Sequence, residues 1–163
     1  MNRIVFITGF MLLATLCIHG TALGANNISF SSVAEVEVTT VDANGIKKTQ
    51  REPALMVPPG EIVIYTNAFT NLGSQPAEDL IINNPVPQNT EYLGGSATEE
   101  GVNVIFSANG GGTFATPNNI FITDGTGGKK LASPSDYTNI RWTLQSPLPP
   151  GETGFVEFRV RVK

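Results

Sequence analysis

The sequence predicts an all-β protein, an immunoglobulin-like antiparallel β-sandwich of about eight to ten strands. Short stretches rich in Val, Ile, Thr, Phe and Tyr follow one another along the chain, and many of the 11 prolines and 17 glycines separate them. Within several stretches apolar and polar residues alternate, which is the pattern of a strand with one buried face. No window of about eleven residues shows the 3.6-residue period of an amphipathic helix.

The chain begins with the features of a secretory signal peptide. Arg3 gives a positive start and residues 4–18 form an apolar run. Small residues of the kind that a signal peptidase accepts follow at Ala22, Gly24 and Ala25. This order of charge, apolar run and small residues predicts a signal over residues 1–24 and a secreted or periplasmic protein.

Cleavage after Gly24 fits best, with cleavage after Ala25 as the alternative. An uncleaved membrane anchor is disfavoured because the apolar run is shorter than the roughly 20 residues of a membrane span. Cys17 would suit lipid attachment only with a small residue before it, and Leu16 stands there. We expect a mature chain of one domain, residues 25–163, with no membrane span.

The first predicted strand covers residues 33–39, where Val36 and Val38 face one side and two glutamates face the other. The following Asn44-Gly45 pair favours a tight turn, since both residues tolerate positive φ. Residues 46–51 then return as a polar, edge-like strand.

Pro-Gly pairs introduce two of the later strands, at residues 62–70 and 156–163. In the last strand, apolar residues from Val156 to Val162 alternate with charged ones. Residues 139–145 alternate in the same way, with Trp142 on the apolar side and Arg141 on the polar side. The other expected strands lie around residues 80–82, 90–98, 102–107 and 120–123. A single helical turn is expected near residues 133–136, with Ser133 as its cap.

Several of these turn-and-strand motifs resemble a family of bacterial and archaeal cell-surface domains known as domain of unknown function eleven. The motifs are Pro59-Gly60-Glu61, Tyr65, Asn71-Leu72-Gly73, residues 80–82, residues 84–87, Tyr137, Arg141-Trp142 and Pro150-Gly151-Glu152. The resemblance covers about residues 33–163 and implies an immunoglobulin-like sandwich at the cell envelope, without an assigned activity. Asn67 departs from it, since an apolar residue is expected there, and Asn84 stands where the family often has Asp.

Composition argues against several function classes. The one cysteine and the one histidine, Cys17 and His19, would leave with the signal. The mature domain could then form neither a disulfide nor a Cys/His zinc site, and it would lack the commonest general base. We expect no enzyme, cofactor or metal. A net charge of −4 also disfavours nucleic-acid binding, which needs a basic patch.

Four polar groupings could suggest chemistry, and each has a structural interpretation. The segment from Ser107 to Phe114 resembles the Asp-box hairpin of sialidase propellers, but it occurs once and Asn109 replaces the aspartate, so we interpret it as a hairpin whose side chains bond their own turn. Asp42 and Asn44 begin like a calcium loop, yet the spacing is wrong for an EF-hand. Glu99-Glu100 is interpreted as a solvated turn. Asp124 has no carboxylate nearby in sequence, and a site assembled in space stays open.

Trp142 is the residue that separates two functional hypotheses. Its alternation with Ile140 and Leu144 predicts a core position, whereas an exposed indole would suit carbohydrate binding. Tyr92, Phe114 and Phe121 are weaker candidates for an exposed stacking surface.

The sequence therefore favours a non-enzymatic module of the cell envelope or extracellular space that acts through protein–protein or matrix contacts. The alternative is a glycan-binding module of similar architecture. A fimbrial subunit joined by strand exchange is weaker, because such subunits lack their own last strand and residues 156–163 supply one. The partner, protein or polysaccharide, is unknown from sequence.

Overall fold

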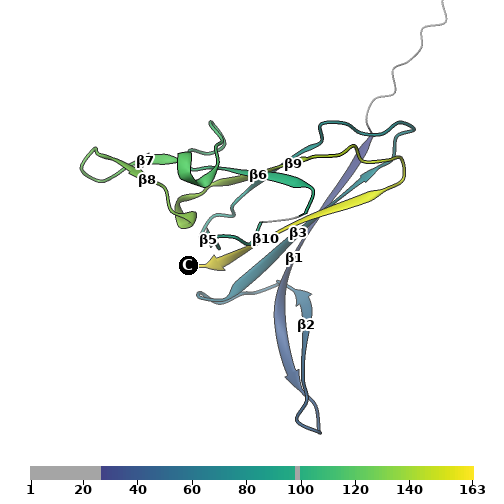
Figure 1. Ribbon diagram of the computed structural model, residues 1–163. Helices are drawn as coiled ribbons and strands as arrows, with labels where there is room; N and C mark the ends of the chain where they lie inside the picture. The colour runs from purple at the N-terminus through teal and green to yellow at the C-terminus, as the bar shows by residue number, and fades with distance from the viewer. Residues whose placement is uncertain (1–26, 98–99) are drawn as a thin grey trace, which may run out of the picture.

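The computed structural model describes residues 27–97 and 100–163, which contain ten strands and two 3₁₀ helices of a single turn each (Figure 1). In chain order they are β1 (Ile28–Val41), β2 (Lys47–Pro53), β3 (Ile62–Asn71), β4 (Ile81–Pro85), β5 (Thr90–Tyr92), β6 (Val102–Ser107), η1 (Pro117–Asn119), β7 (Phe121–Thr123), β8 (Lys129–Leu131), η2 (Pro134–Asp136), β9 (Asn139–Leu144) and β10 (Thr153–Val162). The predicted fold class, an all-β sandwich, is confirmed. The predicted signal, including Ala22, Gly24 and Ala25, lies outside the described residues.

The strands form two facing sheets and one small ribbon. The larger sheet has five strands in the order β2-β1-β3-β10-β5, and the smaller has three in the order β4-β9-β6. The ribbon is the pair β7-β8. Every pair is antiparallel, and β10, the last strand, lies between β3 and β5.

Apolar and polar residues alternate along β9 and β10, and the apolar side chains point between the sheets, where they form the core. Val156, Phe158 and Val160 of β10 are fully buried, and so are Ile140 and Trp142 of β9. The Trp142 and Phe158 rings lie 6.0 Å apart, so the two sheets meet at these side chains. The predicted core position of Trp142 is confirmed. Each such burial contributes about 1.5–3 kcal/mol to folding.

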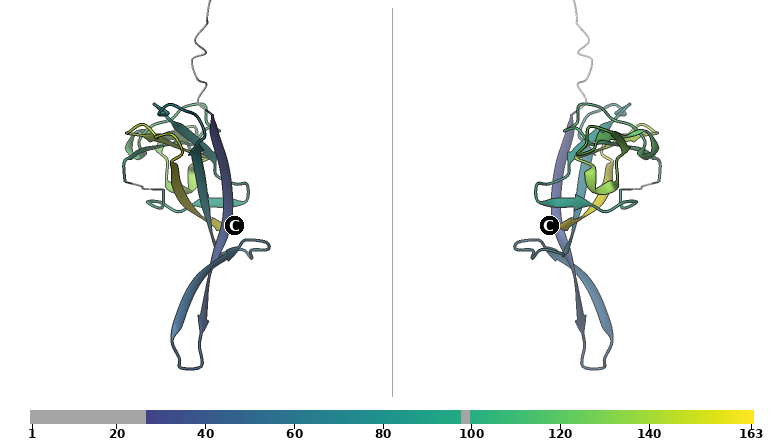
Figure 2. Two further views of the ribbon diagram at one scale, coloured as in Figure 1. Left: turned by 90° about the vertical axis from the view of Figure 1, so that its right-hand side faces the viewer. Right: turned by 90° about the vertical axis from the view of Figure 1, so that its left-hand side faces the viewer.

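The first two strands form the predicted pair joined by a tight turn, but β1 begins earlier than predicted and the pair projects from the body. β1 pairs with β3 over residues 28–35 and with β2 over residues 35–41. Beyond residue 35 the β1–β2 hairpin leaves the body as an arm, which Figure 2 shows from two sides. Every residue of β2 is exposed. β2 is the polar edge strand that the sequence predicts, and in β1 Val36 and Val38 are partly buried while Glu37 is exposed, as the alternation predicts. What the alternation does not reveal is that the hairpin projects from the body.

The turn at the end of this arm forms as predicted. The Asp42 carboxylate oxygen Oδ1 accepts hydrogen bonds from the backbone N–H groups of Asn44 and Ile46, each at 2.9 Å. Gly45 adopts a φ of 79°, which glycine reaches without strain. Asp42 therefore acts as a turn residue.

Two other segments also depart from the prediction. The strand expected at 90–98 ends at Tyr92, because the chain turns there through a bond from the Ser96 N–H to the Leu93 carbonyl. Residues 129–131, for which no element was predicted, form β8. Its turn is held by Asp124, whose Oδ1 accepts the N–H groups of Thr126 and Gly128 at 2.9 and 2.8 Å.

The helical turn near residue 133 is present as η2. The Asp136 carboxylate accepts hydrogen bonds from the Ser133 N–H at 2.8 Å and from the Ser133 hydroxyl at 2.6 Å. These bonds stabilise the charged form and hold the pKa of Asp136 below its usual value.

Candidate functional site

Most residues singled out in the sequence have structural roles. Trp142 has no exposed surface, and its indole N–H donates to the Ala97 carbonyl at 2.9 Å, so it is not a stacking platform. Tyr92 is buried too, with its ring 5.2 Å from that of Phe106. Phe114 is partly buried, and Phe121 is 49% exposed. Phe121 is thus the most accessible of the predicted aromatic candidates.

The Asp-box-like hairpin bonds to itself, which confirms its structural interpretation. Asn109 Oδ1 accepts the Ser107 hydroxyl at 2.7 Å and the Thr113 N–H at 2.9 Å. Its Nδ2 donates to the Thr113 hydroxyl at 3.0 Å. The polar groups of this motif are therefore engaged within the turn.

The acidic candidates are not brought together. Asp42 and Asp124 each organise their own turn, and the three hydrogen-bond donors on Thr126 and Gly128 hold the pKa of Asp124 below its usual value. Glu100 is exposed, and Glu99 lies outside the described residues. Within residues 27–97 and 100–163, no three His, Cys, Asp or Glu side chains gather where they could hold a metal ion.

A set of ion pairs covers the outer face of the larger sheet, a feature that sequence reasoning missed. The Arg51 guanidinium binds the Glu157 carboxylate through two N–H···O bonds, at 2.7 and 3.2 Å. Arg159 pairs with Glu37 at 3.1 Å. Since Arg51 and Glu37 belong to the hairpin and their partners to β10, these pairs fix the base of the arm to the body. The hydrogen bonds that Arg51 donates to the Glu157 carboxylate raise the pKa of Arg51 above its usual value.

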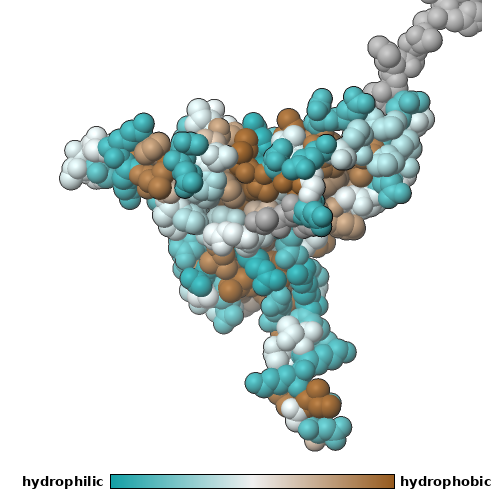
Figure 3. Space-filling model, in the orientation of Figure 1, coloured by the Kyte–Doolittle hydropathy of each residue, from teal (hydrophilic) through white to brown (hydrophobic). Residues whose placement is uncertain are grey.

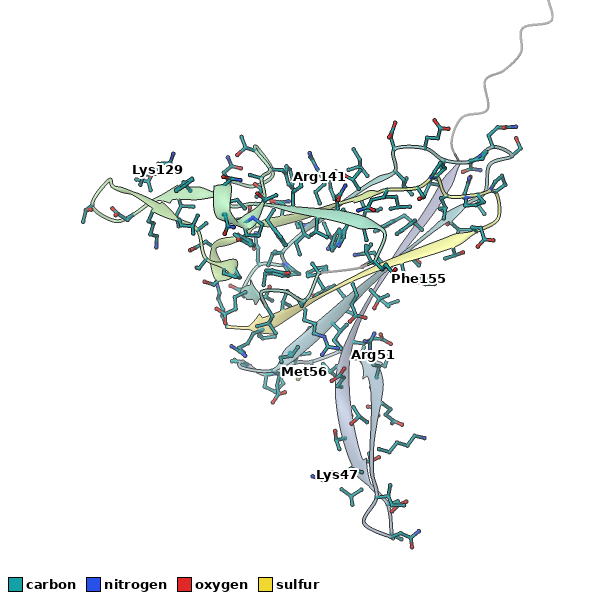
Figure 4. All side chains as sticks on the ribbon, viewed as in Figure 1. Lys47, Arg51, Met56, Lys129, Arg141 and Phe155 are labelled. Carbon is teal, nitrogen blue, oxygen red and sulfur yellow. The ribbon has the colours of Figure 1, made fainter. Side chains whose placement is uncertain are left out.

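Exposed apolar side chains lie at both ends of the arm. Val41 and Ile46, at its tip, are 60% and 62% exposed. Leu55 and Met56, in the loop that follows β2, are 93% and 94% exposed. Figure 3 shows apolar surface near the tip, and Figure 4 places Met56 where the arm meets the body. No sequence signal separates Leu55 and Met56 from buried residues, because they sit in an irregular segment.

A cavity of about 480 Å³ lies at the opposite side of the molecule, between the 108–115 segment and the β7–β8 ribbon. Its lining combines polar and apolar groups: Thr113, Asn119, Ile120, Phe121, Thr123 and Lys129. The Lys129 ammonium lies 4.3 Å from the centre of the Phe121 ring, a cation–π contact. Its volume falls within the range of small-ligand sites.

Comparisons with protein-family models, with curated proteins and with solved structures find no match for this chain. In the part of the chain that the structure describes, no helix is long and apolar enough to span a membrane.

Proposed function

We propose that this protein is a non-enzymatic, exported module of the cell envelope or extracellular space that acts through protein–protein contacts, with the β1–β2 arm as its docking element. The observation that carries the proposal is the arm itself. An isolated two-stranded ribbon is at best marginally stable in water. We therefore interpret the projecting ribbon as a segment that a partner protein covers and stabilises in a complex.

The exposed apolar residues support the same proposal. Leu55 and Met56 are almost fully exposed beside the base of the arm, and Val41 and Ile46 are exposed at its tip. Apolar residues that gather on a surface are typical of interaction sites. The ion pairs of Arg51 and Arg159 hold the arm in one direction, which lowers the entropy lost when a partner binds.

The test uses the mature chain as bait in envelope extract, with retained proteins identified and quantified. We expect the double variant Leu55→Ser, Met56→Ser to lose its partner while its thermal midpoint stays unchanged, because neither side chain is buried. Ile81→Ser is the matched control, since Ile81 is also exposed but lies on β4. Equal capture by the double variant and the wild type would contradict the role of this surface.

A glycan-binding module is the second candidate function, and the cavity beside Phe121 and Lys129 favours it. Sugar-binding sites use aromatic rings and hydrogen-bonding side chains in concave surfaces, and this cavity offers both. The resemblance to domain of unknown function eleven is compatible with either candidate.

A further inference from the structure

Arg141 differs from the other arginines of the described residues. Arg51, Arg159 and Arg161 each lie within 4.0 Å of a glutamate carboxylate. Arg141 has no ion pair with any acidic side chain in the described part of the chain, although it is only partly exposed. Its positive charge is therefore not neutralised by an ion pair within the described residues.

Two contacts hold the Arg141 guanidinium in place. Its central carbon Cζ lies 3.7 Å from the centre of the Phe114 ring, and its Nε–H donates to Asn83 Oδ1 at 2.7 Å. Neither terminal nitrogen, Nη1 or Nη2, has a hydrogen-bond partner among residues 27–97 and 100–163. A guanidinium fixed in this way presents a preorganised fork of N–H groups, which matches the two oxygens of a carboxylate.

The cross-strand neighbours of Arg141 are uncharged, and they include both polar and apolar side chains. Arg141 lies on β9, the central strand of the smaller sheet, with Asn83 and Ile105 as its cross-strand neighbours. Asn103 pairs with Thr143 on the same face. Amide and hydroxyl groups of this kind can both donate and accept hydrogen bonds.

Lys129 repeats the arrangement at the cavity. Its ammonium also lies over a phenylalanine ring, that of Phe121, and it has no acidic partner within 4.0 Å among the described residues. Phe114 lies in the segment between β6 and β7, and Phe121 is the first residue of β7. In Figure 4 Lys129 and Arg141 both lie along the upper side of the molecule, away from the arm.

We propose that this side of the protein binds a carboxylate-bearing polysaccharide, with Arg141 on one uronate carboxylate and Lys129 near another. The inference rests on the second candidate function, glycan binding, and names its ligand class. Cations on two separate elements, Arg141 on β9 and Lys129 beside Lys130 on β8, fit a polymer whose carboxylates are spaced by hydroxyl-rich rings. An acidic peptide carries its carboxylates closer together, so its binding site would need more cations near Arg141.

The experiment is affinity electrophoresis of the mature protein in gels that contain polygalacturonate, neutral dextran or poly-L-glutamate. We expect retardation by polygalacturonate that weakens as salt rises, since exposed charge interactions are screened. Arg141→Gln should weaken binding by about tenfold or more, as expected from the loss of a charge-assisted bond. Arg161→Gln is the matched control and should bind as the wild type does, because Arg161 pairs with Glu91 on the other sheet.

A second variant guards against a folding defect in the first. Phe114→Leu leaves the charge of Arg141 but removes the ring beneath it, so affinity should fall while the thermal midpoint and circular dichroism keep their wild-type values. Wild-type retardation of both folded variants would overturn the assignment of Arg141.

The remaining outcomes separate this inference from the function on which it rests. Equal retardation by dextran and polygalacturonate would keep glycan binding and overturn the carboxylate preference. Stronger retardation by poly-L-glutamate would overturn the polysaccharide in favour of an acidic protein. Retardation by none of the three polymers would overturn both the inference and the glycan-binding function.

Discussion

Two asparagines on the inward face of β3 show how the same side chain can stabilise or destabilise a core. Asn71 is fully buried, and its Nδ2 donates to the carbonyls of Gln75 and Leu148, both at 2.8 Å, while its Oδ1 accepts the Gly73 N–H. Asn67 is equally buried, yet neither atom of its amide has a hydrogen-bond partner in the described residues. An unpaired buried polar group costs about 1–3 kcal/mol.

Replacing Asn67 should therefore stabilise the protein. Asn67→Leu keeps the branching of the side chain at Cγ and removes the unpaired amide, so the free energy of unfolding should rise by about 1–3 kcal/mol, measured by urea denaturation. Asn71→Leu is the opposite control and should lower it, because three backbone groups lose their partner. A lower urea midpoint for Asn67→Leu would show that its amide is paired in solution.

For the candidate sites, the sequence predicted the face of the strand on which a residue lies, but not its neighbours on other strands. Alternation along β9 placed Trp142 inward and Arg141 outward, and both positions are confirmed. Among the described residues Arg141 has no carboxylate partner because none of its neighbours on β4 and β6 is acidic, and these strands meet β9 only in the folded sheet. Such neighbours are far apart in the chain, so no local pattern could reveal them.

At the scale of elements, the turn η2 depends on the ionised form of one carboxylate. Asp136 accepts two hydrogen bonds from Ser133, which hold its pKa below the usual value of 3.8. A pKa lowered by folding adds stability above the unfolded-state pKa, and this contribution is lost as pH falls through the folded-state pKa.

Asp136→Ala should therefore lower the thermal midpoint near neutral pH. The difference from the wild type should shrink as pH falls below the usual value of 3.8 and should vanish once Asp136 is protonated in both states. Scanning calorimetry of both proteins between neutral and strongly acidic pH measures it. A difference that persists unchanged in acid would mean that the side chain contributes through packing and not through its charge.

Strand boundaries were predictable where the period-two pattern is strong. β6 has the predicted bounds, residues 102–107, and β3 differs by one residue at its end. β1 begins at Ile28, five positions earlier than expected, because its pairing with β3 starts at that residue. β8 escaped prediction since its three exposed residues are ordered by β7 and by the Asp124 turn.

The two proposed contact surfaces lie on different parts of the molecule. The glutamate–arginine pairs lie on the outer face of the larger sheet, next to the arm and its exposed apolar residues. Arg141 and Lys129, which have no ion pair among the described residues, lie on the smaller sheet and on the β7–β8 ribbon. The two proposed contacts therefore use separate surfaces, so a protein partner and a polysaccharide could be bound at once.

What joins these regions is the core around Trp142. This residue lies on the smaller sheet, contacts Phe158 of the larger sheet and donates to the Ala97 carbonyl at 2.9 Å. Because the chain has one tryptophan, its fluorescence reports on this position alone. The native emission should be blue-shifted and should resist quenching by iodide.

Removing the indole should affect the entire sandwich and not one surface. Trp142→Ala leaves a cavity and an unpaired carbonyl, so it should cost about 3–5 kcal/mol, a large share of the roughly 5–15 kcal/mol that stabilises a typical domain. Trp142→Phe fills more of the space and should lose less. Urea denaturation followed by circular dichroism measures both variants. A Trp142→Ala protein with wild-type stability would show that the sheets are held together elsewhere, and the buried position assigned to this side chain would then be wrong.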